Sequence, residues 1–149
     1  MKAVIQRVRG AKLTADGVPF SESGAGMLIL LGVCPDDTEK EVDFLVRKCA
    51  NIRIFEDENG KMNLSPTDAK AEVMAVSQFT LMGDCSQGNR PYFGGAARPE
   101  TAKPLYEKFC ADLGKLLPTK TGVFGAEMQI ETVCDGPVTI LLDTKELMK

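Results

Sequence analysis

The chain has 149 residues, with 18 Lys and Arg against 21 Asp and Glu, for a net charge of −3. Hydrophobic residues make up 44% and charged residues 26%, which is typical of one soluble globular domain, here residues 1–149. The chain contains no histidine, which excludes Ser-His-Asp and Cys-His catalysis as well as imidazole metal ligands. Because the net charge is slightly negative, a contact with nucleic acid requires a local basic patch.

Cysteine usage favours a reducing compartment. The number of cysteines is odd and no Cys-x-x-Cys spacing occurs, so neither a disulfide framework nor a zinc cluster is expected. The N-terminus lacks the apolar stretch of a signal peptide, and the longest apolar run, 27–33, is far short of the about 20 residues of a membrane span. We therefore expect a cytoplasmic protein with no membrane partner. The five cysteines are Cys34, Cys49, Cys85, Cys110 and Cys134.

Apolar and β-branched residues predict several strands in the first half of the chain. One strand is expected at 2–9, and the Asp16-Gly17 turn predicts a hairpin between 12–15 and 18–22. The continuous apolar run 27–33 indicates a strand that is buried on both faces. The other strands expected in this half are 52–55, followed by a turn at 56–60, and 72–78.

Two helices are expected. Thr38 followed by Glu41 has the spacing of a capping box, and apolar residues then recur at helical spacing as far as Cys49. The second helix is expected at about 100–117. Between these helices, the irregular segment 82–99 combines Gly, Pro and Asn with aromatic residues, which is typical of a functional loop.

The chain is expected to end in two strands, 127–133 and 138–142, around a turn at Asp135-Gly136-Pro137. Most X-Pro bonds in folded proteins are trans, so these residues alone favour a trans Gly136–Pro137 bond. Strands and helices do not alternate regularly, which argues against a doubly wound parallel sheet. The predicted fold class is α/β, with a mixed, mainly antiparallel sheet and two helices.

Three segments carry polar residues where a site could form. Ser77-Gln78-Phe79-Thr80-Leu81 ends a buried strand and is either a capped strand end or the rim of a polar pocket. Asp135-Gly136-Pro137 is either a simple turn or a rigid backbone wedge. In the third segment, 88–93, Arg90 is a candidate for holding a phosphate or a carboxylate. No P-loop and no dinucleotide-binding glycine motif is present.

Over essentially the whole chain, the sequence resembles the D-aminoacyl-tRNA deacylase family in its bacterial and eukaryotic branch. The segments that carry the resemblance are MKAVIQRV, MLILLGV, RIFEDENGKMNLS, AVSQFTL, GNRPYF, TGVFGAEMQI and DGPVTI. Among them, S-Q-F-T-L and G-P-V-T correspond to the family's two signature motifs. The sequence differs from the family pattern at Cys134, where Asn is usual, and at Ser86-Gln87, where a basic pair is common.

The resemblance implies a β-rich roll with two helices, and a homodimer with its active sites at the subunit interface. The expected reaction is hydrolysis of the ester that joins a D-amino acid, or mischarged glycine, to the terminal ribose of tRNA. The expected partners are therefore D-aminoacyl-tRNA and glycyl-tRNA. No metal and no organic cofactor is expected.

Specific residues match the functional positions of that family. Gly136 and Pro137 match a cis Gly-Pro element that rejects L-amino acids, and Arg7 matches an arginine that supports this element. The residues that match the catalytic motif are Ser77, Gln78, Phe79 and Thr80. The candidates for contacts with tRNA are Arg90, Arg98 and Lys103.

In a chain without histidine, we expect the substrate to assist its own hydrolysis. Backbone N–H groups near Phe79 and Thr80 would stabilise the oxyanion, and the ribose 2′-hydroxyl would position or activate water. One alternative is a non-catalytic dimeric module that binds aminoacyl or nucleotide ligands. A second is a thiol hydrolase that uses Cys85 or Cys134. A third is an enzyme with a trans Gly-Pro bond that also accepts a small L-residue.

Overall fold

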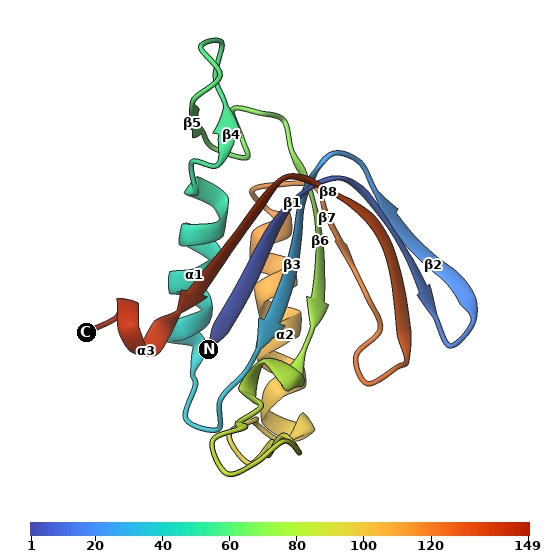
Figure 1. Cartoon of the computed structure of the whole chain (residues 1–149), viewed down its shortest axis with the longest axis vertical. Coiled ribbons are helices and arrows are strands. Elements are labelled where there is room, and N and C mark those ends of the chain that lie inside the picture. The colour runs from blue at the N-terminus through green and yellow to red at the C-terminus, as the bar shows by residue number, and fades with distance from the viewer.

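A six-stranded sheet forms the centre of the computed structural model, which describes all 149 residues (Figure 1). Its order is β2-β1-β3-β6-β7, and β8 pairs with the other edge of β1. The pairs of β1 with β2, β3 and β8 are antiparallel, whereas β3-β6 and β6-β7 are parallel, which confirms the mixed, mainly antiparallel sheet. The strands are β1 (Lys2–Ala15), β2 (Val18–Ser23), β3 (Gly26–Gly32), β6 (Glu72–Ser77), β7 (Thr119–Thr121) and β8 (Met128–Asp143).

β1 is one strand of 14 residues and replaces the two short strands expected at 2–9 and 12–15. Its first part pairs with β3 and its last part with β2, so one long strand serves two neighbours. The last part folds over the sheet until β2 reaches β7, where the Ser21 hydroxyl donates to the Thr121 carbonyl at 2.7 Å. The sheet is therefore nearly closed, in agreement with the expected roll.

The expected turn at Asp135-Gly136-Pro137 is wrong, because β8 runs through this segment as a single strand. Gln6 pairs with Thr139 and Val8 pairs with Cys134, so four residues of β8 lie opposite Arg7 alone. Extra residues on one strand bulge out of the ladder and bend the strand without reversing it. The Gly136–Pro137 bond is cis, where the residues alone favoured trans. We call Asp135–Val138 the Gly-Pro bulge.

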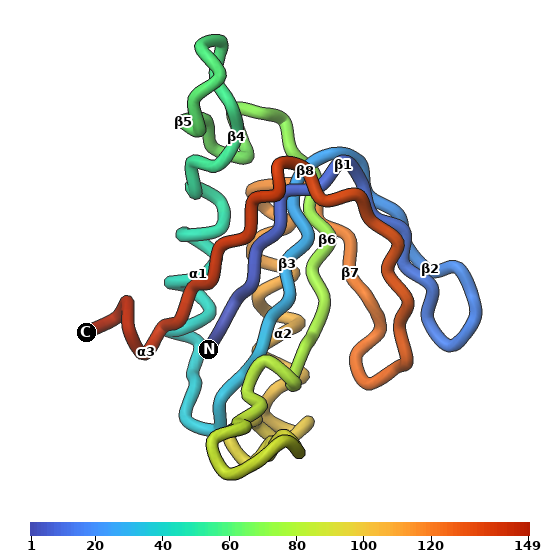
Figure 2. Tube along the Cα trace, in the orientation of Figure 1, coloured from blue at the N-terminus to red at the C-terminus, as the bar shows by residue number.

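The two expected helices, α1 (Glu39–Asn51) and α2 (Pro99–Gly114), lie side by side on one face of the sheet (Figures 1 and 2). The capping box is confirmed, because the Thr38 hydroxyl accepts from the Lys40 amide and the Glu41 carboxylate accepts from the Thr38 amide. α2 ends at Gly114, three residues before the expected end at about residue 117. Two short helices were not expected, the 3-10 helix η1 (Phe79–Met82) and α3 (Thr144–Leu147). None of the helices has the length and apolarity that crossing a membrane requires.

The main core lies between the sheet and the two long helices, with Phe109 of α2 and Leu45 of α1 fully buried against β1 and β3. A smaller apolar cluster on the other face of the sheet includes Leu13 and Met74. Six of the seven residues of β3 are buried, which confirms the strand predicted to be buried on both faces.

A small hairpin, β4 (Phe55–Glu56) and β5 (Met62–Leu64), projects beyond the C-terminal end of α1 (Figure 2). The strand expected at 52–55 therefore shrinks to two residues that begin at Phe55. The expected turn is present, since the Gly60 amide donates to the Asp57 carbonyl at 3.0 Å. Gly60 has a φ of 73°, a conformation that glycine adopts at little cost.

Candidate functional site

A cavity of about 630 Å³ opens where β6 ends and η1 begins, and we call it the β6 cavity. Its volume lies in the range of small-molecule sites. Eleven of its sixteen lining residues are hydrophobic, so it suits a ligand with substantial apolar surface. Its larger apolar side chains are Phe79, Phe93, Phe124, Met128 and Ile130.

The polar edge of the β6 cavity is formed by the first predicted motif. Ser77, Gln78 and Phe79 line the cavity, whereas Thr80 does not. The Thr80 hydroxyl instead accepts a hydrogen bond from the Gln78 side-chain amide. The Gln78 backbone amide donates to the Leu31 carbonyl of β3 at 2.8 Å, which anchors the motif to the sheet. The four predicted residues therefore lie together.

Two backbone amides at the start of η1, those of Phe79 and Thr80, have no acceptor inside their helix. The helix η1 is closed by hydrogen bonds from Leu81 N to the Gln78 carbonyl at 3.3 Å and from Gly83 N to the Thr80 carbonyl at 3.0 Å. The first N–H groups of a helix lack an intrahelical acceptor, and here they belong to Phe79 and Thr80. Paired amides of this kind can stabilise an oxygen that becomes negative during a reaction.

Aromatic rings stand at the mouth of the cavity. Phe79 is 56% exposed and packs edge to face against Phe93, with ring centroids 5.2 Å apart. Phe93 belongs to the predicted functional loop, whose base is closed by backbone hydrogen bonds between Asp84 and Tyr92. The Ser86 amide, which donates to the Asp84 carboxylate, holds the pKa of that carboxyl below its usual value. The residues alone did not identify Phe93 or Phe124 as cavity walls, although large aromatics between glycines were a usable signal.

The Gly-Pro bulge is an exposed piece of backbone held by a buried arginine. Arg7 donates from Nε to the Asp135 carbonyl at 3.1 Å and from Nη1 to the Ile54 carbonyl at 2.7 Å. Gly136 has a φ of 128°, and a Cβ there would lie 2.8 Å from Cγ2 of Val138 and 3.2 Å from Nη2 of Arg7. Only glycine fits this position without displacement. Arg7 thus contacts the bulge directly, and its role as the support of the selector stays a prediction.

The end of β6, beside which the cavity lies, and the middle of β8, which carries the Gly-Pro bulge, are at opposite ends of the sheet (Figure 1). Arg7, which faces the bulge, pairs with Met27 of β3, whereas Ser77 pairs with Leu31 of the same strand. Four residues along the strand and three strand spacings separate the two places by roughly 20 Å. The two predicted motifs therefore do not meet within one copy of the chain.

Of the three cationic residues predicted to contact tRNA, one lines the β6 cavity. Arg98 lines the β6 cavity at the start of α2. Arg90 is exposed in the preceding loop and does not line the cavity. Lys103 also lies outside it and forms an ion pair with Glu107 at 3.8 Å.

No cysteine lines the β6 cavity, which argues against a thiol nucleophile there. Cys85 and Cys134 are exposed, and the other cysteines are buried and unpaired. Burial raises the pKa of Cys49 to about 12 and that of Cys110 to about 11, so both thiols stay protonated and unreactive at neutral pH.

The donor atoms of Cys34, Asp36 and Asp37 lie within 4.8 Å of one another. Asp37, however, already accepts hydrogen bonds from the Met1 ammonium at 2.8 Å and from the Cys34 amide at 2.6 Å. None of the three residues lines the β6 cavity. We interpret this cluster as an anchor of the N-terminus.

Comparisons with known proteins cover nearly the whole chain. The family model described as D-Tyr-tRNA(Tyr) deacylase matches residues 4–143. A solved structure of a "c-Myc DNA Unwinding Element Binding Protein" is 44% identical, with a TM-score of 0.90, and the match covers 96% of this chain and 98% of that one. A second, described as "a probable eukaryotic D-amino acid tRNA deacylase", has a TM-score of 0.82 over 95% of this chain and 97% of the other. At 16% identity, the second match shows the fold alone.

Proposed function

The chain belongs to the D-Tyr-tRNA(Tyr) deacylase family and is a D-aminoacyl-tRNA deacylase, a proofreading hydrolase of translation; on this premise we propose that the β6 cavity holds the ester. We propose further that the Gly-Pro bulge of a second copy selects the configuration of the amino acid. The observation that carries this proposal is an apolar cavity whose polar edge, Ser77-Gln78-Phe79, leads directly into the helix-start amides of Phe79 and Thr80.

The cavity chemistry supports hydrolysis without a histidine or a metal. Its apolar walls suit the terminal nucleobase and an amino-acid side chain. Water attacks the ester carbonyl, and the amides of Phe79 and Thr80 donate to the resulting oxyanion. Collapse of the intermediate breaks the bond to the ribose 3′-oxygen, which takes up the proton that the attacking water loses. The substrate's own 2′-hydroxyl, beside the ester, positions the water. The products are the free amino acid and the free tRNA.

In this proposal Thr80 positions other groups and does not attack the ester. Its hydroxyl accepts a hydrogen bond from Gln78, and the chain has no histidine to remove its proton. A hydroxyl without an adjacent base is a weak nucleophile. The proposed role of Thr80 is to hold the Gln78 side chain at the edge of the cavity.

The Gly-Pro bulge is suited to select by exclusion. Gly136 and Pro137 are exposed, and Arg7 fixes the backbone beside them through the Asp135 carbonyl. Rigid backbone placed on the side where an L-residue carries its Cβ rejects that enantiomer by a clash. A D-residue and glycine have no side chain on that side, so the proposed substrates are D-aminoacyl-tRNA and glycyl-tRNA.

A homodimer with active sites at the interface is part of the proposal. The separation of roughly 20 Å means that the bulge reaches only the cavity of another copy. In addition, β8 pairs with β1 alone, so its other edge is free. Val133 and Leu141 on this strand are 61% and 60% exposed, and apolar residues on an open strand edge favour association.

The function is tested by incubating the protein with the same tRNA charged with D-tyrosine, L-tyrosine or glycine. We expect loss of the D-tyrosyl and glycyl esters and retention of the L-tyrosyl ester. Equal cleavage of the two enantiomers would defeat the selector. Cleavage of none, with tight tRNA binding, would favour the binding module.

Shared sites are tested by mixing two variants. Ala96→Trp blocks the cavity but keeps the bulge, and Gly136→Ala keeps the cavity but distorts the bulge. In mixed dimers, the open cavity of one copy receives the intact bulge of the other, so an excess of Ala96→Trp protein suppresses the L-ester cleavage of the Gly136→Ala protein. An unchanged rate of L-ester cleavage, or a monomer by light scattering, contradicts the interface site.

A second candidate function follows from the relative that is 44% identical and described as binding a DNA unwinding element. The net charge of −3 does not favour nonspecific DNA binding. Titration with duplex DNA at physiological salt, beside the deacylation assay, separates the two functions.

Because tRNA is the substrate and all cysteines are unpaired, we propose a cytoplasmic location.

A further inference from the structure

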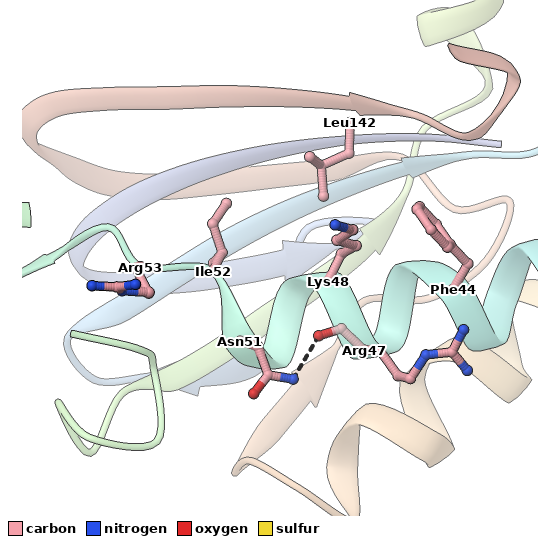
Figure 3. Close-up of a pocket in the computed structure, with 7 residues that line it drawn as sticks. All are labelled: Phe44, Arg47, Lys48, Asn51, Ile52, Arg53 and Leu142. Atoms are coloured by element: carbon pink, nitrogen blue, oxygen red, sulfur yellow. Dashed lines mark hydrogen bonds between the residues drawn. The ribbon is translucent and has the colours of Figure 1, made fainter. Parts of the chain in front are cut away.

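A groove of about 480 Å³, separate from the β6 cavity, runs between the C-terminal half of α1 and the end of β8 (Figure 3). We call it the α1 groove. Lys48 points from the helix toward the strand that carries Leu142, and Arg53 lies beyond the end of the helix (Figure 3). The charged residues of the groove are Arg47, Lys48 and Arg53, and its apolar residues are Phe44, Ile52 and Leu142.

The α1 groove concentrates positive charge on an acidic chain. No carboxylate lines it, and Arg47, Lys48 and Arg53 take part in none of the ion pairs of the molecule. All three are exposed. By contrast, Arg98 and Lys103 are paired with Glu100 and Glu107. The groove is thus a local basic patch of the kind that a chain of net charge −3 needs in order to attract phosphates.

The helix dipole accounts for only part of this charge. A cation in the last turn of a helix is stabilised by the free carbonyls there, which explains Lys48. Arg53 lies outside the helix. Its guanidinium donates from Nε to the Asn63 carbonyl at 2.9 Å and from Nη2 to the Asn63 side chain, so neighbouring β5 orients it. An arginine oriented in this way keeps Nη1 free for a phosphate oxygen.

The position of Arg53 links the groove to the proposed selector. Arg53 directly precedes Ile54, whose carbonyl accepts from Arg7 at 2.7 Å. Arg7 also donates to Asp135, the residue before Gly136. One end of the α1 groove therefore lies next to the Gly-Pro bulge. When that bulge enters the cavity of a partner copy, the groove comes to lie beside the same cavity.

We propose that the α1 groove binds backbone phosphates of the tRNA acceptor arm, on the tRNA whose ester lies in the partner copy's β6 cavity. This inference rests on the proposed function. The groove takes phosphates of an arm that leaves the cavity past the bulge. One subunit then supplies the reacting cavity, and the other supplies both the selector and the cationic track.

The test uses the full-length triple variant Arg47→Gln, Lys48→Gln, Arg53→Gln. We expect KM for D-tyrosyl-tRNA to rise about tenfold or more at low salt, and the slope of log(kcat/KM) against log[salt] to become shallower by about 2. Cleavage of D-tyrosyl-adenosine, which lacks those phosphates, keeps the wild-type rate. The matched control removes three unpaired lysines outside the groove, as Lys40→Gln, Lys120→Gln, Lys149→Gln.

Three results would contradict the proposal that the α1 groove binds tRNA phosphates. These are an unchanged salt slope, a change no larger than in the control, and a loss of duplex DNA binding with tRNA kinetics intact. If the triple variant unfolds at a lower temperature than the wild type, the single variants Arg47→Gln and Arg53→Gln are measured instead. For each of them, we expect the slope of log(kcat/KM) against log[salt] to change by about 0.7 to 0.9. If the wild-type protein hydrolyses none of the esters, the proposed function is contradicted but the phosphate-binding role of the α1 groove is not. The salt dependence of binding to uncharged tRNA, compared between wild type and triple variant, then tests that role.

Discussion

The β6 cavity and the Gly-Pro bulge are two halves of one proposed site with opposite shapes. The cavity is concave and mostly apolar, and its polar groups sit at the start of η1. The bulge is convex and exposed, and a buried Arg7 holds its backbone. The cavity can accommodate a ligand, whereas the bulge has no cavity of its own and can act only by entering that of another copy. Binding and selection are thus separated within each chain, and they come together only through a second copy.

The largest effect is expected from a substitution that fills the β6 cavity. Ala96 lines the β6 cavity from a loop, so the bulky side chain of Ala96→Trp displaces the ligand while the core stays intact. We expect kcat/KM for D-tyrosyl-tRNA to fall about 100-fold or more. The control Ala111→Trp adds the same volume on the exposed side of α2 and keeps the wild-type rate. Equal kinetics for the two variants would place the reaction elsewhere.

The bulge is tested by the smallest substitution. In Gly136→Ala the added Cβ lies 2.8 Å from Val138 and 3.2 Å from Arg7, so the backbone must shift. We expect the ratio of D- to L-ester cleavage to fall at least about tenfold, measured on one tRNA charged with each enantiomer. Gly60→Ala, also at positive φ but with open space around it, adds a methyl group without a clash and keeps the ratio. A preserved ratio in Gly136→Ala would end the selector role.

A milder change separates positioning from nucleophilic attack inside the cavity motif. Thr80→Ala removes the hydroxyl that accepts from Gln78. The loss of one hydrogen bond of this kind is expected to lower kcat about two- to tenfold. A loss of several orders of magnitude, with unchanged thermal stability, would instead identify Thr80 as the attacking group.

The smallest effect is expected from the two exposed thiols, one near each region. Cys85 lies in the loop beside the cavity mouth, and Cys134 precedes the bulge, and neither lines the cavity. Cys85→Ser and Cys134→Ser are expected to keep the wild-type kcat/KM in a single-turnover assay. Abolished turnover in either folded variant would revive the thiol hydrolase.

Local patterns predicted much of the fold because the responsible interactions are short in range. The capping box at Thr38 and Glu41 is satisfied within four residues, and the apolar run of β3 needs only burial to become a strand. The end of β4 and the short β5 and β7 escaped prediction because pairing partners, and not their own residues, make them strands. For the same reason Asp135-Gly136-Pro137 was predicted as a turn, although β1 on its flank keeps the chain extended.

The sequence by itself determined the residue inventory, namely a chain without histidine, an S-Q-F-T-L strand end and a Gly-Pro pair, together with its resemblance to the deacylase family. Only the tertiary structure decided where these parts lie. In the folded chain, Phe93 and Phe124 from two distant loops line the same cavity as Ser77 and Gln78, and the Gly-Pro bulge lies at the far end of the sheet. The tertiary structure also placed Leu142 of β8 beside the cations of the α1 groove. The physical reason is that long-range strand register and helix packing set these distances, and no local pattern encodes them.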